Sequence, residues 1–221
     1  MGSNKFIITG ATGWFGKTSI FEYIRLYGID MCRENIAAFS SKATEIKIDD
    51  FGLKLKTKPL EAIETEINPK GIFHTAFLTK DKIKKLGLEK YVQSNERIIS
   101  LIENYIKNNT KCPIIHISSG AASKLDNNSF KVDIDPYAYL KKKEENIWKD
   151  FSLNRMSLIL RVYASTGKFL SNPSKYAIGD FLQKTMNKKR IKIKSKNKVL
   201  RSYVNIGSLC ELSWKILKEP L

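Results

Sequence analysis

Two tyrosine–lysine pairs in the middle of the chain have a spacing suited to proton transfer at a hydroxyl group. They are Tyr137/Lys141 and Tyr139/Lys143. On a helix this spacing places both side chains on one face, so that the ammonium can stabilise a phenolate whose reference pKa, about 10, is otherwise too high for a base at neutral pH. A chain of this composition contains about one such pair by chance. The two pairs point to nearly opposite helix faces, about 200° apart, so only one of them can serve.

A second chemical signal is the stretch TGATGWFGK at residues 9–17. It lies between an apolar run and a segment that reads as a helix. There Gly10 would permit a tight turn, Gly13 a close backbone approach to a pyrophosphate, and Gly16 the packing of helix against strand. The ending Gly16-Lys17-Thr18 resembles that of a Walker A motif, which however needs four residues between its glycines. The stretch therefore predicts a dinucleotide-binding loop and not a P-loop.

The elements that must position these residues alternate between strand and helix. Apolar runs rich in β-branched or aromatic residues predict strands at 6–9, 35–39, 71–77, 113–118 and 157–162. Helices are predicted at 18–27, 60–67, 91–107 and 137–151. This order predicts an α/β fold, a Rossmann-type doubly wound parallel sheet covered on both faces. The alternation at 46–58 interrupts it and predicts an exposed antiparallel hairpin with its turn near Phe51-Gly52.

The pattern changes after Gly167, which suggests a division into a Rossmann domain, residues 1–167, and a small C-terminal substrate lobe with a returning segment, residues 168–221. The lobe is expected to hold a helix around 176–186 and a basic strand at 190–194. The lysine-rich run at 188–201 could grip nucleic acid, yet it has no interleaved aromatic residues for base stacking. A solvated strand edge, protected from pairing by its lysines, is the preferred interpretation.

Several segments in a fixed order resemble one family. TGATGWFG is similar to the TGxxGxxG motif of the extended short-chain dehydrogenase/reductases, the NAD-dependent epimerase/dehydratases. Further similar segments are IFHTAF (72–77), an asparagine in the following helix (Asn95), IIHISSGAAS (114–123), PYAYLK (136–141), LILRVYASTG (158–167) and RSYVNIGSL (201–209). The resemblance covers nearly the whole chain, and the ordered set is more specific than any single piece.

The resemblance implies roles for individual residues. Ser119 would hydrogen-bond the substrate oxygen, Tyr137 would be the acid or base, and Lys141 would support Tyr137 and bond the nicotinamide ribose. Pro136 and the preceding strand favour this pair over the second one. Arg201 would contact the substrate diphosphate. The implied cofactor site consists of Gly10, Thr12, Gly13, Trp14, Phe15, Gly16, Ser40, Ser41, Lys42, Ala76, Phe77 and Lys141.

Departures from the family pattern narrow the expected chemistry. The dehydratase branch carries an Asp-Glu pair where this chain has Gly120 and Ala121, so dehydration of that type is not expected. Leu140 replaces the serine of PYxxSK without disturbing the tyrosine–lysine geometry. Extended members continue into a larger sugar-binding lobe. A short form, a truncation, or a site completed by association in a homodimer would each explain the difference.

The choice of dinucleotide depends on the end of the second strand, where an acidic residue would bond the ribose hydroxyls of NAD. Here the chain has Ser40, Ser41 and Lys42, whose hydroxyls and cation suit a 2′-phosphate better. The sequence therefore favours NADP(H) over NAD.

Composition excludes several classes of protein. An apolar content of 42% indicates a globular chain, and no apolar run approaches the length of a membrane span. Three scattered cysteines argue against a disulfide framework, and two histidines in apolar strands, His74 and His116, are expected to pack in the core and not to bind metal. The net charge of +17 favours anionic partners without naming one.

Together these observations predict a cytoplasmic NAD(P)-dependent oxidoreductase or epimerase that acts on a nucleotide-linked sugar, as in surface-polysaccharide synthesis. The alternative is a catalytically inactive Rossmann relative that serves as a cofactor-sensing or RNA-binding module, which the net charge of +17 keeps open.

Overall fold

A mixed sheet forms the centre of the molecule. The computed structural model describes residues 4–126, 131–152, 156–193, 195–198, 200 and 202–219. The strands of the main sheet are β1 (Phe6–Thr9), β2 (Ile36–Ser40), β3 (Thr44–Ile48), β4 (Leu53–Pro59), β5 (Gly71–His74), β6 (Ile114–Ser119) and β7 (Ser157–Val162). Their order is β3-β4-β2-β1-β5-β6-β7, and every neighbouring pair is parallel except β3 and β4. The predicted doubly wound α/β fold is confirmed.

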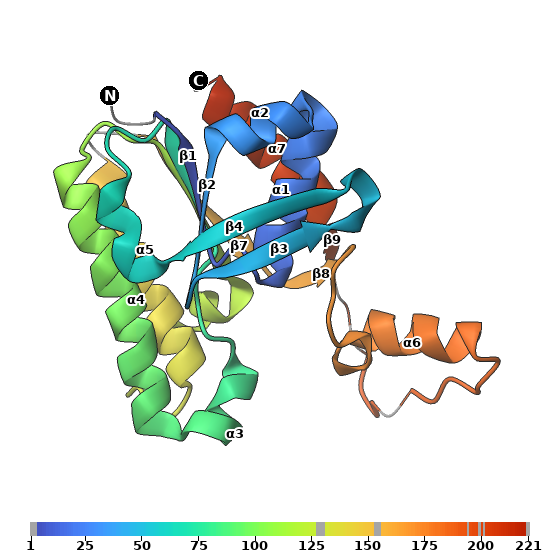
Figure 1. The fold of residues 1–221 in the computed structure, drawn as a ribbon. Coiled ribbons are helices and arrows are strands. Elements are labelled where there is room, and N and C mark those ends of the chain that lie inside the picture. The colour runs from blue at the N-terminus through green and yellow to red at the C-terminus, as the bar shows by residue number, and fades with distance from the viewer. Residues whose placement is uncertain are drawn as a thin grey trace.

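Helices cover both faces of the sheet (Figure 1). They are α1 (Trp14–Tyr27), α2 (Ile29–Asn35), α3 (Ile83–Leu86), α4 (Leu88–Asn108), α5 (Pro136–Phe151), α6 (Ala177–Met186) and α7 (Ile206–Lys218). Two short strands, β8 (Ala164–Thr166) and β9 (Tyr203–Asn205), pair in parallel beside the main sheet. Figure 1 shows α1 and α7 on one side of the sheet and α4 and α5 on the other.

Strand β1 shows why both faces need a cover. Phe6 and Ile8 belong to one hydrophobic cluster, and Ile7 between them belongs to the other, because successive side chains of a strand point to opposite faces. The first cluster contains Trp214 of α7, which packs edge-on against Phe6, and the second contains Trp148 of α5. All five side chains are nearly or fully buried. Because these strands are parallel, their carboxyl ends lie at one edge of the sheet. The predicted site residues lie at this edge.

The predicted hairpin forms, but it is not an exposed appendage. Strands β3 and β4 pair in antiparallel fashion around a turn that ends at Gly52, whose φ is 60°. Strand β4 also pairs in parallel with β2 and so extends the sheet. Ile46, Ile48 and Leu53 are at most 1% exposed, so the expectation of an exposed hairpin was wrong.

Two further expectations for local structure were wrong. The segment predicted as a helix at 60–67 forms a 3₁₀-helix, Leu60–Thr65, which buries Leu60 and Ile63. These two residues are three apart, which matches the 3₁₀ period. The apolar face is too short to support an α-helix. The described part of the basic segment, residues 190–193, is exposed and forms no strand, since no strand in the described part of the chain pairs with it.

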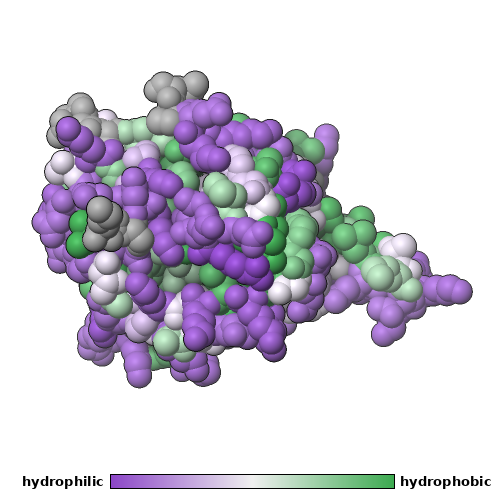
Figure 2. Space-filling model, turned by 45° about the horizontal axis from the view of Figure 1, so that its top comes forward, coloured by the Kyte–Doolittle hydropathy of each residue, from purple (hydrophilic) through white to green (hydrophobic). Residues whose placement is uncertain are grey.

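The chain after β8 both leaves and rejoins the body. Helix α6 projects away from the sheet, whereas α7 returns and packs against α1 (Figure 1). The Trp214 indole of α7 donates a hydrogen bond to the Ser19 carbonyl (2.8 Å). Figure 2 shows mostly polar side chains on one face of the body and apolar ones near the base of the projecting segment. The division into units 1–167 and 168–221 stays a prediction.

Candidate active site

The glycine loop follows β1 and is held by backbone contacts that leave no room for side chains. Gly10 has a φ of 67°, and a Cβ there would lie 2.7 Å from the backbone nitrogen of Ala76. A Cβ on Gly16 would lie 2.4 Å from the Gly10 carbonyl oxygen, and one on Gly13 would lie 3.1 Å from the same oxygen. The Gly13 N–H donates to that carbonyl (2.9 Å). The loop thus has the tight turn and the helix–strand approach that its sequence predicts.

Helix α1 begins directly after this loop with its first N–H groups turned to the sheet edge. Gly13 is the N-cap and supplies no side-chain partner, and no acidic residue lies in the first turn. Such an end attracts an anion such as a pyrophosphate. Thr12 and Gly13 are exposed. Binding of dinucleotide phosphates at this open helix end stays a prediction.

The side chain of Trp14 is committed elsewhere. Its Nε1 donates to the carbonyl of Lys168 (2.6 Å), and its ring packs edge-on against Tyr176 at 5.6 Å between centroids. It also contacts the Phe15 ring. Trp14 therefore fastens the chain after β8 to the start of α1. Its side chain is engaged in these contacts, so only its backbone could contribute to the predicted cofactor site.

The predicted ribose-binding residues lie at the end of β2 in two different environments. Ser40 is 4% exposed, and its hydroxyl is engaged with the Thr57 hydroxyl (2.8 Å) and the Lys42 carbonyl (2.7 Å). Ser41 and the Lys42 side chain are exposed. Of the three, Ser40 holds the β2–β4 junction together, and the other two face solvent.

A chain of contacts joins the glycine loop to the tyrosine–lysine pair. Ala76, against which Gly10 packs, is followed by Phe77, whose ring meets the Tyr137 ring edge-on at 5.7 Å. The Lys141 ammonium lies 3.8 Å from the centre of the same Phe77 ring. Asn95 of α4 fixes this stretch by accepting a hydrogen bond from the Leu78 N–H (2.8 Å).

Lys141 also reaches the strand that carries Ser119. Its Nζ donates to the carbonyl of Ile117 (3.0 Å), two residues before Ser119 on β6. The Ser119 side chain accepts a hydrogen bond from the Ala121 N–H (3.1 Å) and caps the 3₁₀-helix Gly120–Leu125. Its own O–H remains a donor.

The second tyrosine–lysine pair faces away from this edge. Lys143 forms an ion pair with Glu96 of α4 (2.6 Å), and both side chains are more than 40% exposed. The rotation of two residues along α5 therefore separates the pairs as the helical geometry requires. The first pair, by contrast, contacts Phe77 in the segment after β5 through both Tyr137 and Lys141.

Helix α5 begins at a cap that also gathers two loops. The Asp135 carboxylate accepts from the Ala138 N–H (3.3 Å) and forms ion pairs with Lys124 (2.8 Å) and Lys80 (3.4 Å). Partial burial raises the pKa of Asp135, but the hydrogen bond from Lys124 and that from the Ala138 N–H outweigh it, so the pKa lies below its usual range. The cap fixes the first turn of the helix, which carries Tyr137.

A buried polar cluster lies directly inside Lys141, and sequence reasoning did not find it. The Nε2 of His74 lies 2.8 Å from Glu144 Oε1, and its Nδ1 lies 2.6 Å from the Thr9 hydroxyl. The Lys141 ammonium donates to Glu144 Oε2 (3.0 Å), and His116 Nε2 lies 3.2 Å from the same oxygen. His74, His116 and Glu144 are at most 1% exposed. The two histidines pack in the core as predicted, with stacked rings 5.3 Å apart, but they also surround a carboxylate.

Within this cluster, the burial of His116 and of Glu144 has different consequences for their charge. Burial lowers the pKa of His116 to about 4, so its ring is neutral at neutral pH. Burial opposes ionisation of Glu144 as well, yet its close approach to His116 and Lys141 and its hydrogen bond with His74 hold its pKa well below the usual range. Potential ligand atoms of His74, His116 and Glu144 lie within 4.8 Å of one another. Because the Lys141 ammonium already neutralises Glu144, a divalent cation there would leave uncompensated positive charge in the core.

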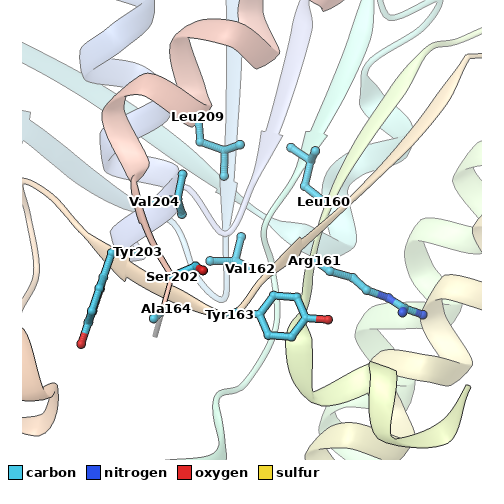
Figure 3. Close-up of a pocket in the computed structure, with 9 residues that line it drawn as sticks. All are labelled: Leu160, Arg161, Val162, Tyr163, Ala164, Ser202, Tyr203, Val204 and Leu209. Atoms are coloured by element: carbon cyan, nitrogen blue, oxygen red, sulfur yellow. The ribbon is translucent and has the colours of Figure 1, made fainter. Parts of the chain in front are cut away.

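The positions that would carry the dehydratase acid pair are partly covered. A Cβ on Gly120 would lie 2.3 Å from the Tyr163 ring, which therefore occupies the space of a side chain at this position. Tyr163 borders an apolar cavity of about 220 Å³ beside the end of β7. In Figure 3 Leu160, Val162, Val204 and Leu209 gather around this cavity. Tyr163 is a neighbour of the site that the sequence analysis missed. Arg201 lies outside the described residues.

Comparison with known proteins identifies the fold. No family model and no curated protein sequence matches the chain. A UDP-N-acetylglucosamine 4-epimerase from Methanobrevibacter ruminantium M1, solved with UDP-N-acetylmuramic acid, is similar in structure (TM-score 0.73, 19% identity, 100% of this chain and 75% of that one). The enzyme WbmH of Bordetella bronchiseptica, solved with NAD+, is similar at a TM-score of 0.70 (15% identity, 98% and 73%).

A third similar structure is that of a GalE-like L-threonine dehydrogenase from Cupriavidus necator. Its TM-score is 0.72, with 12% identity over 98% of this chain and 73% of that one. The chain therefore has the Rossmann-type fold shared by these solved enzymes, all of which are longer. No helix among the described residues is long and apolar enough to cross a membrane.

Proposed function

We propose that the chain is an NAD(P)-dependent oxidoreductase or epimerase of the extended short-chain dehydrogenase/reductase type that acts on a nucleotide-linked sugar. One observation carries the proposal: an unbroken set of contacts runs from Gly10 through Ala76 and Phe77 to Tyr137 and Lys141. These contacts bring the residues of the proposed phosphate cradle and of the proposed acid–base pair to one edge of the sheet. The fold of a sugar-nucleotide epimerase and of an NAD+ complex supports the assignment.

The residues at this edge of the sheet would have separate roles in cofactor binding and proton transfer. The N–H groups at the start of α1, with Gly10, Gly13 and Gly16, would hold the pyrophosphate. The dinucleotide, when bound, supplies the hydride donor or acceptor. Tyr137 would take the proton from a substrate hydroxyl or return it to a carbonyl, and the Lys141 charge, one helical turn away, would favour the phenolate. Ser119 would donate its O–H to the substrate oxygen and orient it.

The second tyrosine–lysine pair supplies a matched control for this mechanism. We expect Tyr137→Phe to lower turnover at least about 100-fold and Tyr139→Phe to leave it near that of the unaltered protein. Turnover is assayed over a panel of nucleotide sugars, after dinucleotide released by denaturing the purified protein has been identified. Retained activity of the Tyr137→Phe protein would refute Tyr137 as the acid or base. Salt-sensitive RNA binding without turnover would favour the inactive-relative alternative instead.

We infer a preference for NADP(H), because the exposed Ser41 and Lys42 offer a hydroxyl and a cation where an NAD-specific site has an acid. Replacing Lys42 by Asp should shift the ratio of NADPH to NADH affinity toward NADH by about tenfold, since the new charge repels a 2′-phosphate. Lys47→Asp, at an exposed position of the following strand β3, is the control for net charge. Tighter binding of NADH than of NADPH by the unaltered protein would contradict the preference. Arg201 as a substrate-binding residue, a homodimer and a cytoplasmic location stay predictions.

A further inference from the structure

Helix α5 carries two adjacent buried carboxylates with entirely different partners. Glu145 accepts from the Ser118 hydroxyl (2.5 Å) and from Arg161 through Nε (2.9 Å) and Nη2 (2.6 Å). It ties α5 to β6 and β7. Glu144, on the next position, faces Lys141 and the two histidines. Only one of these two carboxylates therefore touches the proposed acid–base pair.

Lys141 depends on Glu144 for its charge balance. Lys141 is 4% exposed, and Glu144 is the carboxylate with which its ammonium forms an ion pair among the described residues. A buried ammonium without a counter-charge is strongly disfavoured and gives up its proton. Its other neighbours, the Ile117 carbonyl and the Phe77 ring, attract a cation but carry no net charge.

The groups around Glu144 leave Lys141 as its principal cation. His74 faces it from β5 and His116 from β6. The His116 ring is neutral at neutral pH, as described above. The hydrogen bonds that His74 makes to Thr9 and Glu144 hold one carboxylate oxygen and leave the other oriented toward Lys141.

We propose that Glu144 is a positioning residue that keeps the Lys141 ammonium charged and in place one helical turn from Tyr137. This rests on the function proposed above. Of the three N–H donors of the ammonium, Glu144 and Ile117 engage two, which leaves one for a ribose hydroxyl. His74 and Thr9 extend the anchor to β5 and β1, so the position of the charge is set by the sheet and not by α5 alone.

The first test does not depend on catalysis. It compares Glu144→Gln, which removes the charge and keeps the shape, with Glu145→Gln, an equal change at the adjacent buried position. The side-chain nitrogen NMR signal of Lys141, assigned with Lys141→Arg, is followed as the pH is raised. In Glu144→Gln, the pH at which the ammonium signal gives way to that of the amine should fall by at least one unit, a tenfold change in proton affinity. In Glu145→Gln it should stay where it is in the unaltered protein. Equal behaviour of the two variants would overturn the proposal.

The second test uses turnover and separates this proposal from the proposed function. Glu144→Gln should lower kcat at least tenfold, with a loss that grows as the pH rises. Glu145→Gln should lower the melting temperature but keep kcat within threefold. If Glu144→Gln does not fold, Glu144→Asp, which keeps the charge and shortens the side chain, should show a smaller NMR shift of the same sign. Absence of turnover on any nucleotide sugar would refute the function, whereas the NMR comparison would still decide the role of Glu144.

Discussion

The two halves of the candidate site, the glycine loop and the acid–base pair, differ in whether backbone or side chains form them. The glycine loop is almost entirely backbone: its shape depends on the lack of side chains at Gly10 and Gly16 and on the N–H groups of α1. The acid–base half is almost entirely side chain: Lys141 is held by a carboxylate that is itself held by histidines from two strands. The first half therefore tolerates no added atoms, whereas the second depends on charge.

This difference predicts how each half fails. An added methyl group in the loop meets fixed backbone, which can move only if the strand or the helix moves with it. A change in the polar cluster instead alters which groups carry charge, and the fold persists if the cavity stays filled. The three predictions below test this contrast, from the largest effect on stability to the smallest.

The largest effect is expected from Gly10→Ala. The new Cβ meets the backbone of Ala76 at 2.7–2.8 Å in addition to the strain of a φ of 67°, so we expect a loss of about 4 kcal/mol in the free energy of unfolding and no dinucleotide binding. Gly52→Ala is the matched control, because Gly52 has a φ of 60° with open space around it. It should cost about 1 kcal/mol and leave binding intact. Urea unfolding and a dinucleotide titration measure both variants, and equal losses would refute the backbone argument.

The next effect concerns acid stability. The folded-state pKa of His116, about 4, lies below its unfolded value of about 6.5. The unfolded chain therefore takes up a proton that the folded chain refuses, and stability falls as the pH drops from about 6.5 toward 4. His116→Leu should remove up to about 3 kcal/mol of this pH dependence. Denaturant unfolding at several values of pH measures the slope, and an unchanged slope between pH 6.5 and 4 would contradict the prediction.

The smallest effect is expected at the end of β2. Ser40→Ala removes a buried hydroxyl that bonds Thr57 and the Lys42 carbonyl, so we expect a loss of about 1 kcal/mol. Ser41→Ala, at an exposed position, should change stability by less than about 0.5 kcal/mol. If Ser41→Ala proved the more damaging of the two, the assignment of Ser40 as the structural residue would be wrong.

Local patterns in the sequence were enough for the order of the main elements and for the glycine loop. The alternation of apolar runs and helical segments predicts the parallel sheet, because such strands must be buried on both faces. The errors arose where partners are distant. The 46–58 hairpin was expected to be exposed because its lysines alternate with apolar residues, but β4 joins β2 and buries the apolar side. The basic segment at 190–193 has a strand-like pattern, but none of the described strands pairs with it.

The sequence by itself determined the cradle, because three glycines at fixed spacing after a strand act through backbone geometry, which is local. It also determined the two candidate tyrosine–lysine pairs, since their spacing is a helical property. Only the tertiary structure showed that Lys141, and not Lys143, reaches the sheet edge beside Phe77. Only it brought His74, His116 and Glu144 together across residues 74–144, because their contact depends on how two strands and a helix pack. Glu144 lies three residues from Lys141 on α5, but the histidines that surround its carboxylate come from β5 and β6, and the sequence gives no sign that they meet it there.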